Sequence, residues 1–272
     1  LAGYPAGTVN RATFANIDPQ GNAGTTALSR GDWAAASNIV LGESSYANIA
    51  LEADVDASTR VMTVDVEMYF TGAGAPGSVN LNVALLQSGI EGPQTGASSF
   101  NPGNILPNGN YVHNHMLRHL LTGQWGEVIS TTTSGTLVSK QYTYTLPADI
   151  NDVDLVLGDL DIVAFVAEGQ QVIATGAHGP VSYSNLQNDD GAIANIVAPE
   201  ITCGSTMDVD FDLTNAGATN ITSATIEYGF PGQATNTYNY TGNIGTFETE
   251  VVTLSSVSIP AGGGTLSIEV TE

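Results

Sequence analysis

Strict alternation of apolar and polar side chains is the feature that most limits how this chain can fold. Between Arg60 and Phe70 the apolar set is Met62, Val64, Val66, Met68 and Phe70. Thr63, Asp65 and Glu67 lie between them. A period of two places the apolar set on one face of an extended strand, whereas a helix has a period of 3.6. The pattern therefore predicts a β-strand with one buried face.

Similar alternation recurs downstream and predicts one antiparallel β-domain over residues 46–187. The alternating apolar sets are Leu81, Val83 and Leu85, and then Tyr142, Tyr144 and Leu146. Residues 160–167 are apolar on both faces, as expected of a central strand. We expect these strands to form an antiparallel β-sandwich.

A second β-pattern follows a Gly-, Ala- and Asn-rich stretch, residues 188–198, which we interpret as a linker that ends before Pro199. Met207, Val209, Phe211 and Leu213 alternate there with Asp208, Asp210 and Asp212. Further short strand patterns are separated by turns such as 215–217 and 260–264. Residues 199–272 are therefore predicted to form a small immunoglobulin-like β-sandwich, with the three aspartates on its outer face. The predicted fold class is mainly β, with sandwiches in tandem.

Two segments favour helices. Asp32 can cap a helix that contains three alanines and ends near Gly42. Val112, Met116 and Leu120 are spaced i, i+4 and i+8, which predicts a helix over residues 111–122 inserted in the first sandwich.

Charge excludes several classes of partner. The chain has 27 acidic and 5 basic residues, a net charge of −22. Binding to nucleic acid requires clustered Lys and Arg, so we expect no nucleic-acid partner. No apolar run reaches the roughly 20 residues that cross a bilayer, so no membrane-spanning segment is predicted. The low charged fraction of 12% leaves a neutral polar surface, which is common in extracellular β-proteins.

Cys203 is the single cysteine, so no disulfide can form within these residues. It is either a small buried apolar residue or the partner of a cysteine elsewhere. Leu1 is not preceded by a Met or by a basic and apolar leader, which suggests a mature product or an excised piece.

The segment 111–127, YVHNHMLRHLLTGQWGE, resembles a signature of the outer-membrane-protein-28-related family, together with 83–87 and 162–166. Signature residues in this resemblance are His113, His115, Arg118 and Trp125, and Pro5 and Arg11 in the stretch 3–11. It implies a secreted or surface protein of bacteria that use type IX secretion. It also implies a thioredoxin-like domain before the sandwich.

The same resemblance makes residues 1–45 the C-terminal part of a thioredoxin-like domain, with 3–11 as its cis-proline loop. A cis Tyr4–Pro5 bond is therefore expected. Because the sequence contains no Cys-x-x-Cys, redox activity does not extend to these residues. We also expect residues 1–45 to pack on the next domain, because so short a chain rarely sustains its own core.

Acidic residues offer a candidate calcium site. Calcium takes six to eight oxygen ligands from carboxylates and loop carbonyls. A single short segment carries Asp149, Asp152, Asp154, Asp159 and Asp161. Solvated acidic turns are the alternative, because the Asp-x-Asp-x-Asp-Gly order of a calcium loop is missing.

Three of the four histidines, His113, His115 and His119, lie within seven residues. On a helix only His115 and His119 would share a face, so structural histidines are favoured over a transition-metal site. Arg118 is expected to pair with a carboxylate. No nucleophile, phosphate-binding or dinucleotide motif is present, and we predict that the chain is not an enzyme.

The sequence thus predicts a non-catalytic extracellular or cell-surface structural or adhesion protein. Its partners would be other copies or domains of a larger secreted assembly, and no cofactor is expected besides calcium. One alternative is a surface module that binds carbohydrate or peptide. The other is a fragment of a thioredoxin-like oxidoreductase whose active half lies upstream.

Overall fold

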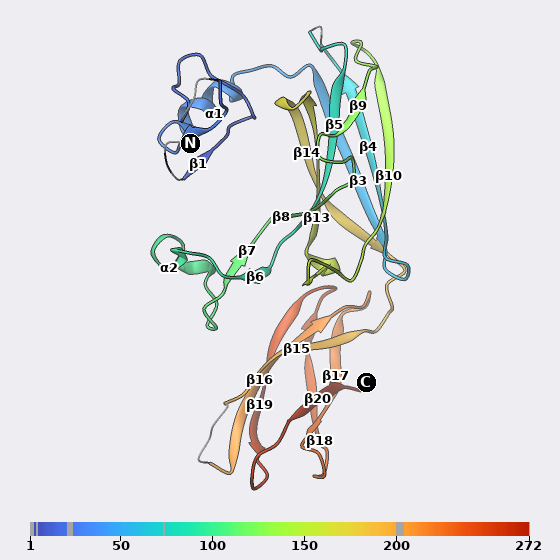
Figure 1. Cartoon of the computed structure of the whole chain (residues 1–272). Coiled ribbons are helices and arrows are strands. Elements are labelled where there is room, and N and C mark those ends of the chain that lie inside the picture. The colour runs from blue at the N-terminus through green and yellow to red at the C-terminus, as the bar shows by residue number, and fades with distance from the viewer. Residues whose placement is uncertain (1–2, 4, 21–23, 73, 200–203, 272) are drawn as a thin grey trace. The chain divides into compact units, whose positions relative to one another are not determined.

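The chain folds into two compact units, Leu1–Ser184 and Asn185–Glu272 (Figure 1). The structure is a computed structural model that describes residues 3, 5–20, 24–72, 74–199 and 204–271. Strands are the main secondary structure of both units, in agreement with the mainly β prediction. None of the helices in the described ranges is long and apolar enough to cross a membrane.

The first residues form two short strands and one helix. β1 (Ala6–Gly7) pairs with β2 (Leu28–Ser29), and α1 spans Trp33–Leu41. The predicted helix is confirmed, with Asp32 before it and Gly42 after it. The Asp32 side chain makes no capping hydrogen bond, whereas the Gly42 N–H donates to the Ile39 carbonyl. The expected cis bond at Tyr4 lies outside the described residues.

An eight-stranded sheet dominates the first unit. Its strands are β3 (Ala47–Asp56), β4 (Val61–Phe70), β5 (Val79–Gln87), β8 (Met116–Leu120), β9 (Glu127–Ile129), β10 (Leu137–Thr145), β13 (Leu160–Glu168) and β14 (Gln171–Ser184). They follow the order β10-β4-β3-β14-β13-β5-β8, and β9 also pairs with β5. Every pair is antiparallel except β14 with β3.

β14 joins the two halves of this sheet. Residues 171–180 pair with β13, and Val181–Ser184 pair with β3. The core takes side chains from both halves, for example Val64 and Met68 of β4 and Val83 of β5. The alternation in β4 is confirmed, because Met62, Val64, Val66, Met68 and Phe70 are all fully buried.

The predicted helix over 111–122 is wrong. The segment forms β7 (Tyr111–His113) and β8, joined by Asn114 and His115. His115 has φ 54°, which a right-handed helix does not contain. Leu117 and Leu120 pair in register with Leu86 and Ala84 of β5. Pairing with a buried strand therefore overrides the helical spacing, which the sequence shows only locally.

Several short elements leave the main sheet. β6 (Ile90–Gly92), α2 (Ala97–Phe100), the 3₁₀ turn η1 (Pro102–Asn104) and β7 form a separate lobe, residues 90–114, labelled by β6, α2 and β7 in Figure 1. β11 (Asp149–Ile150), β12 (Val153–Asp154) and the 3₁₀ turn η2 (Leu157–Asp159) connect β10 to β13. We call residues 146–159 the acidic loop.

The second unit has two three-stranded sheets around one apolar core. β15 (Gly191–Val197), β16 (Thr206–Asn215) and β19 (Thr249–Ser258) form one sheet. β18 (Asn236–Ile244), β17 (Ile221–Gly229) and β20 (Ser267–Val270) form the other. Val209, Phe211 and Leu213 point into the core between them, as the alternation predicts.

The predicted linker at 188–198 is wrong, because this segment contains β15. The small side chains of these residues indicated a flexible connection. The segment is nevertheless a strand, because its backbone pairs with β16. The two units therefore divide at 184/185.

Candidate functional site

The lobe carries the most exposed aromatic side chain of the described residues. Phe100, at the end of α2, is 86% exposed, although Phe side chains are usually buried. A pocket of about 500 Å³ lies beside it, within the range of roughly 300–1,000 Å³ that is usual for small-molecule sites. Its aromatic and amide lining comprises Gln94, Phe100, Asn101, Asn104, Tyr111, His113 and Asn114.

Hydrogen bonds within the lobe fix the positions of these side chains. Asn101 Nδ2 donates to Tyr111 Oη at 2.8 Å, and Asn104 Nδ2 donates to the Val112 carbonyl at 3.3 Å. The Tyr111 and His113 rings meet edge to face, with centroids 5.0 Å apart. The pocket wall is thus built from rings and planar amides held in one arrangement.

The base of the lobe is attached to the main sheet through backbone groups. Asn114 Oδ1 accepts the Gly89 N–H at 3.0 Å, and the His115 N–H donates to Ser88 Oγ at 3.2 Å. Farther along the lobe, Glu91 accepts hydrogen bonds from Asn108 and Asn110. The Glu91 carboxylate therefore stabilises the lobe itself.

The predicted calcium residues occupy different parts of the acidic loop and the strand after it. Asp149 and Asp154 are paired across β11 and β12, and Asp149 Oδ1 accepts the Asp152 N–H. Asp161, on β13, lies 3.2 Å from His178 Nε2. Burial raises the pKa of Asp159. Among the described residues, no group of three or more His, Cys, Asp or Glu side chains could hold a metal ion.

Two arginines bind the carbonyl groups of the acidic loop. Arg60 donates to the carbonyls of Leu146, Pro147 and Leu155 at 2.9–3.2 Å. Arg118 donates to the carbonyls of Val153, Ile150 and Asp154 at 2.7, 3.3 and 3.5 Å. These carbonyls are the groups that a calcium loop would use as ligands. In this structure the guanidinium groups of Arg60 and Arg118 are the cations that these carbonyl groups contact.

Calcium binding stays a prediction, and it would be checked by comparing the melting temperature in calcium with that in chelator. The expected carboxylate partner of Arg118 is wrong for the residues that the structure describes. Arg118 Nη1 also donates to Gln87 Oε1 at 2.9 Å. Gln87 is buried, and its Nε2 donates to the Asp154 carbonyl, which extends the arginine network into the core.

The histidines lie in separate environments. His119 stacks on Tyr144 of β10 at a centroid distance of 4.0 Å, and His115 is exposed. His113 belongs to the lobe and His178 pairs with Asp161. A transition-metal site required His115 and His119 to share one face of a helix, and this segment forms no helix.

Two residues of the stretch 3–11 attach the N-terminal segment to the main sheet. Asn10 and Arg11 both have positive φ, 52° and 48°. Asn10 Oδ1 accepts the Ile173 N–H at 2.8 Å. The Arg11 guanidinium lies 5.1 Å from the centroid of Phe165, a cation–π contact. Pro5 is exposed. Segment 1–45 thus contacts the main sheet, as expected.

The model of the family described as Outer membrane protein Omp28 matches residues 1–176, which include the lobe, both arginines and Trp125. The chain belongs to the Omp28 family. This confirms the resemblance at the level of the family. A comparison with curated proteins finds no match.

Two solved structures are similar to this Omp28-family chain. One is a domain of the outer membrane lipoprotein Omp28 from Porphyromonas gingivalis, with 19% identity and a TM-score of 0.34 over 51% of this chain and 90% of that one. The other is HBP35 of Porphyromonas gingivalis, with 12% identity and a TM-score of 0.47 over 96% of this chain and 77% of that one. Neither likeness reaches a TM-score of 0.5.

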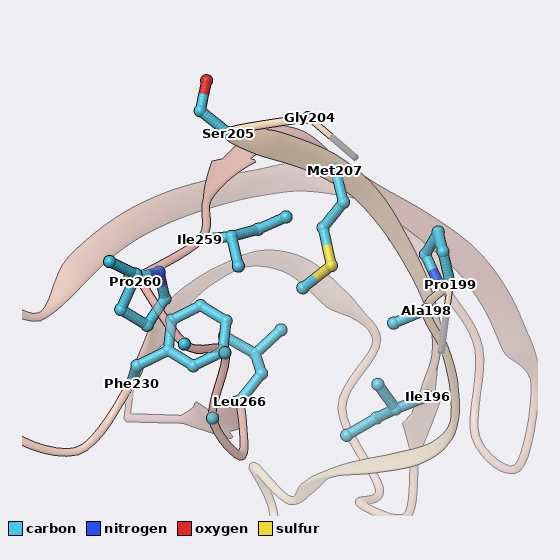
Figure 2. A pocket seen from close by; sticks show the side chains of 14 residues that line it. Ile196, Ala198, Pro199, Gly204, Ser205, Met207, Phe230, Ile259, Pro260 and Leu266 are labelled. Atoms are coloured by element: carbon cyan, nitrogen blue, oxygen red, sulfur yellow. The ribbon is translucent and has the colours of Figure 1, made fainter. Parts of the chain in front are cut away.

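A second pocket lies in the C-terminal unit, beyond the Omp28 match. It measures about 960 Å³ and opens where the two sheets end. Figure 2 shows the side chains of Met207, Ile259 and Leu266 directed into the same space as the ring of Phe230. Ala198, Pro199, Gly204 and Ser205 also line it, and residues 200–203, including Cys203, lie outside the described part of the chain. The side chains that line it are mostly apolar and suit an apolar group.

Sequence reasoning missed the lobe pocket. The signal that could have revealed it is the aromatic and amide content of residues 94–114, which the helical reading of 111–122 concealed.

Proposed function

We propose that this Omp28-family chain is a non-catalytic protein of the outer cell surface, and that the lobe is the element by which it binds its ligand. The observation that carries the proposal is the exposed Phe100 ring beside a pocket of fixed rings and amides. At Phe100 an exposed aromatic ring meets a pocket of ligand size, and concave sites lined by aromatic side chains and a few polar groups are the usual places of ligand binding.

Family membership supports the surface location. The family is described as an outer membrane protein, and a similar solved structure is an outer membrane lipoprotein domain. Secretion by the type IX route, a thioredoxin-like origin for residues 1–45 and immunoglobulin-like units remain parts of this proposal. The pairing of two three-stranded sheets around one core supports the last of these for residues 185–272.

The experiment compares the whole chain with its Phe100→Ala variant on a mixed array of oligosaccharides, peptides and lipids. Phe100 is exposed, so its removal should leave the melting temperature unchanged. We expect the chain to retain at least one class of compound and the variant to lose it. If the chain retains nothing, the binding function is wrong. If both proteins bind equally, the site is elsewhere.

Assembly with other copies is a second candidate function, favoured by the apolar pocket of the C-terminal unit. To test assembly, light scattering would measure the particle mass of the native chain and of the Met207→Asp variant over a range of ionic strengths. A particle larger than one chain that the substitution dissociates would support assembly. One-chain mass under every condition would exclude it.

A further inference from the structure

From the lobe pocket we infer that the ligand is an uncharged saccharide that stacks one sugar face on Phe100; this inference rests on the proposed binding function. The ring of Phe100 offers a flat apolar surface that is almost fully open to solvent. The C–H groups on one face of a pyranose are apolar as well, whereas its rim carries hydroxyl groups. Such a ligand needs both a ring to cover it and polar groups around it.

The polar groups of the pocket have unused hydrogen-bonding capacity. Asn101 and Asn104 each use the side-chain nitrogen inside the lobe. Their Oδ1 atoms accept no hydrogen bond from the described residues, so they can accept from a ligand. Tyr111 Oη accepts from Asn101 and keeps its own proton to donate. A sugar hydroxyl both donates and accepts, and it matches such a mixed set.

The electrostatics of the pocket select a neutral ligand. Among the described residues that line it there is no Asp, Glu, Lys or Arg. A cationic ligand would find no carboxylate in the pocket, because Glu91, the acidic residue of the lobe, does not line it. An acidic saccharide would lack a cation in the pocket and would meet a chain of net charge −22.

The pocket suits a saccharide better than a peptide or an apolar molecule. An apolar ligand would bury the amide groups without partners, which is costly. Extended peptides are usually held along a free strand edge or by apolar side-chain pockets. The strand in this pocket, β7, has three residues and is paired with β6, and polar side chains dominate the lining.

The test measures binding of the whole chain to three probes by calorimetry: cellotetraose, oligogalacturonate and a lysine-rich peptide. Cellotetraose is neutral and presents flat apolar faces, oligogalacturonate carries carboxylates, and the peptide is cationic. We expect binding of cellotetraose alone, with an affinity that does not change between 50 mM and 500 mM salt. Binding of the peptide that salt abolishes would indicate attraction to the net charge and not to this pocket.

Substitutions separate stacking from general apolar contact. Phe100→Trp keeps a flat ring and should retain cellotetraose binding, with a change in tryptophan fluorescence on titration. Phe100→Leu keeps apolar area but loses the ring and should bind about tenfold more weakly. Asn104→Ala should weaken binding as well, and Asn48→Ala, on β3 outside the lobe, should not.

The outcomes distinguish the inference from the proposed function. If the chain binds the acidic probe or the peptide through Phe100, the saccharide class is wrong and the binding function stands. If Phe100→Leu binds cellotetraose as well as Phe100→Trp, stacking is wrong. If no probe binds while the mixed array retains another class through Phe100, the inference fails alone. If the array also retains nothing, both fail.

Discussion

Gly126 shows at the residue scale what the Trp125-Gly126 pair does in the fold. It has φ 82°, a left-handed conformation that favours glycine. A Cβ at this position would lie 2.6 Å from the Leu81 carbonyl oxygen and 2.8 Å from Asn82 Nδ2. The Trp125 carbonyl accepts a hydrogen bond from Asn80 at 2.8 Å. The pair therefore forms the turn that brings β9 onto the buried strand β5, and its role is structural.

Gly126→Ala should lower the free energy of unfolding by about 1–3 kcal/mol, because the backbone would be strained and a backbone contact would be too short. Urea denaturation measures this change. Gly77→Ala is the matched control, since its Cβ would meet no atom within 4 Å, and it should change stability by less than about 0.5 kcal/mol. Equal stability of Gly126→Ala and the native chain would contradict the structural role.

Asp159→Asn should stabilise the protein at neutral pH. Burial raises the pKa of this carboxyl above its ordinary value of 3.8, so the folded state holds the proton more tightly than the unfolded state. The resulting loss of stability begins as pH rises through 3.8 and is complete above the folded pKa. The variant escapes this loss because it does not ionise.

Thermal unfolding at pH 7 and at pH 3 measures this effect. The variant should melt higher than the native chain at pH 7, and the gap should shrink at pH 3. Asp18→Asn is the control for net charge, since Asp18 is exposed and the change in charge is the same. If Asp18→Asn raised the melting temperature by the same amount, the effect would come from reduced repulsion among the acidic residues and not from burial of Asp159.

At the scale of elements, polar side chains connect parts of the first unit that no backbone ladder joins. Glu127 of β9 accepts from Lys140 Nζ at 2.5 Å and from Tyr142 Oη at 2.7 Å, both on β10. These hydrogen bonds lower the pKa of Glu127. The pKa of Tyr142 is raised, mainly by burial of its hydroxyl and next by the hydrogen bond to the Glu127 carboxylate. The half-buried Lys140 on this edge strand also disfavours pairing with another chain.

The arginine network makes the same kind of connection between the acidic loop and the sheet. Arg118→Ala should lower the free energy of unfolding by about 2–3 kcal/mol, because Gln87 and three loop carbonyls lose a charged donor. Arg118→Lys should be intermediate, since an ammonium group lacks the planar fork.

Hydrogen exchange on the acidic loop, together with urea denaturation, gives the measurement. Amide protection in residues 149–155 should fall in Arg118→Ala. Arg30→Ala removes an exposed cation and should change neither quantity. Unchanged protection of the loop in Arg118→Ala would contradict the proposed network.

At the scale of the whole molecule, each unit has its own core. The C-terminal core contains Phe211, Ile226 and Leu254 and is formed entirely within residues 185–272. All Lys, Arg and His residues of the chain lie before this unit, which is therefore purely acidic. Its folding rests on apolar burial, because it contains no cationic side chain to form an ion pair.

Residues 185–272 expressed alone should therefore unfold cooperatively, with a single transition in urea by both fluorescence and circular dichroism. Residues 1–45 alone should show no cooperative transition, because so short a segment rarely sustains its own core and this one also relies on contacts with Phe165 and Ile173. Non-coincident transitions for 185–272 would show that its core is insufficient.

The sequence by itself determined the long alternating strands with their buried faces, the first helix and the scarcity of basic residues. These follow from local periodicity and charge, as the buried set from Met62 to Phe70 shows. It failed at 111–122 and 188–198, where pairing with β5 and β16 decides the backbone. A strand partner is distant in sequence, so spacing cannot reveal it.

Tertiary structure alone decided the candidate sites. In the folded chain the carbonyl groups of the acidic loop accept hydrogen bonds from Arg60 and Arg118. Folding also places Phe100, Asn104 and Tyr111 around one pocket. Composition shows which chemical groups the chain carries. Which groups meet depends on turns and strand pairs that fix side chains far apart along the chain, and that information exists only in the folded molecule.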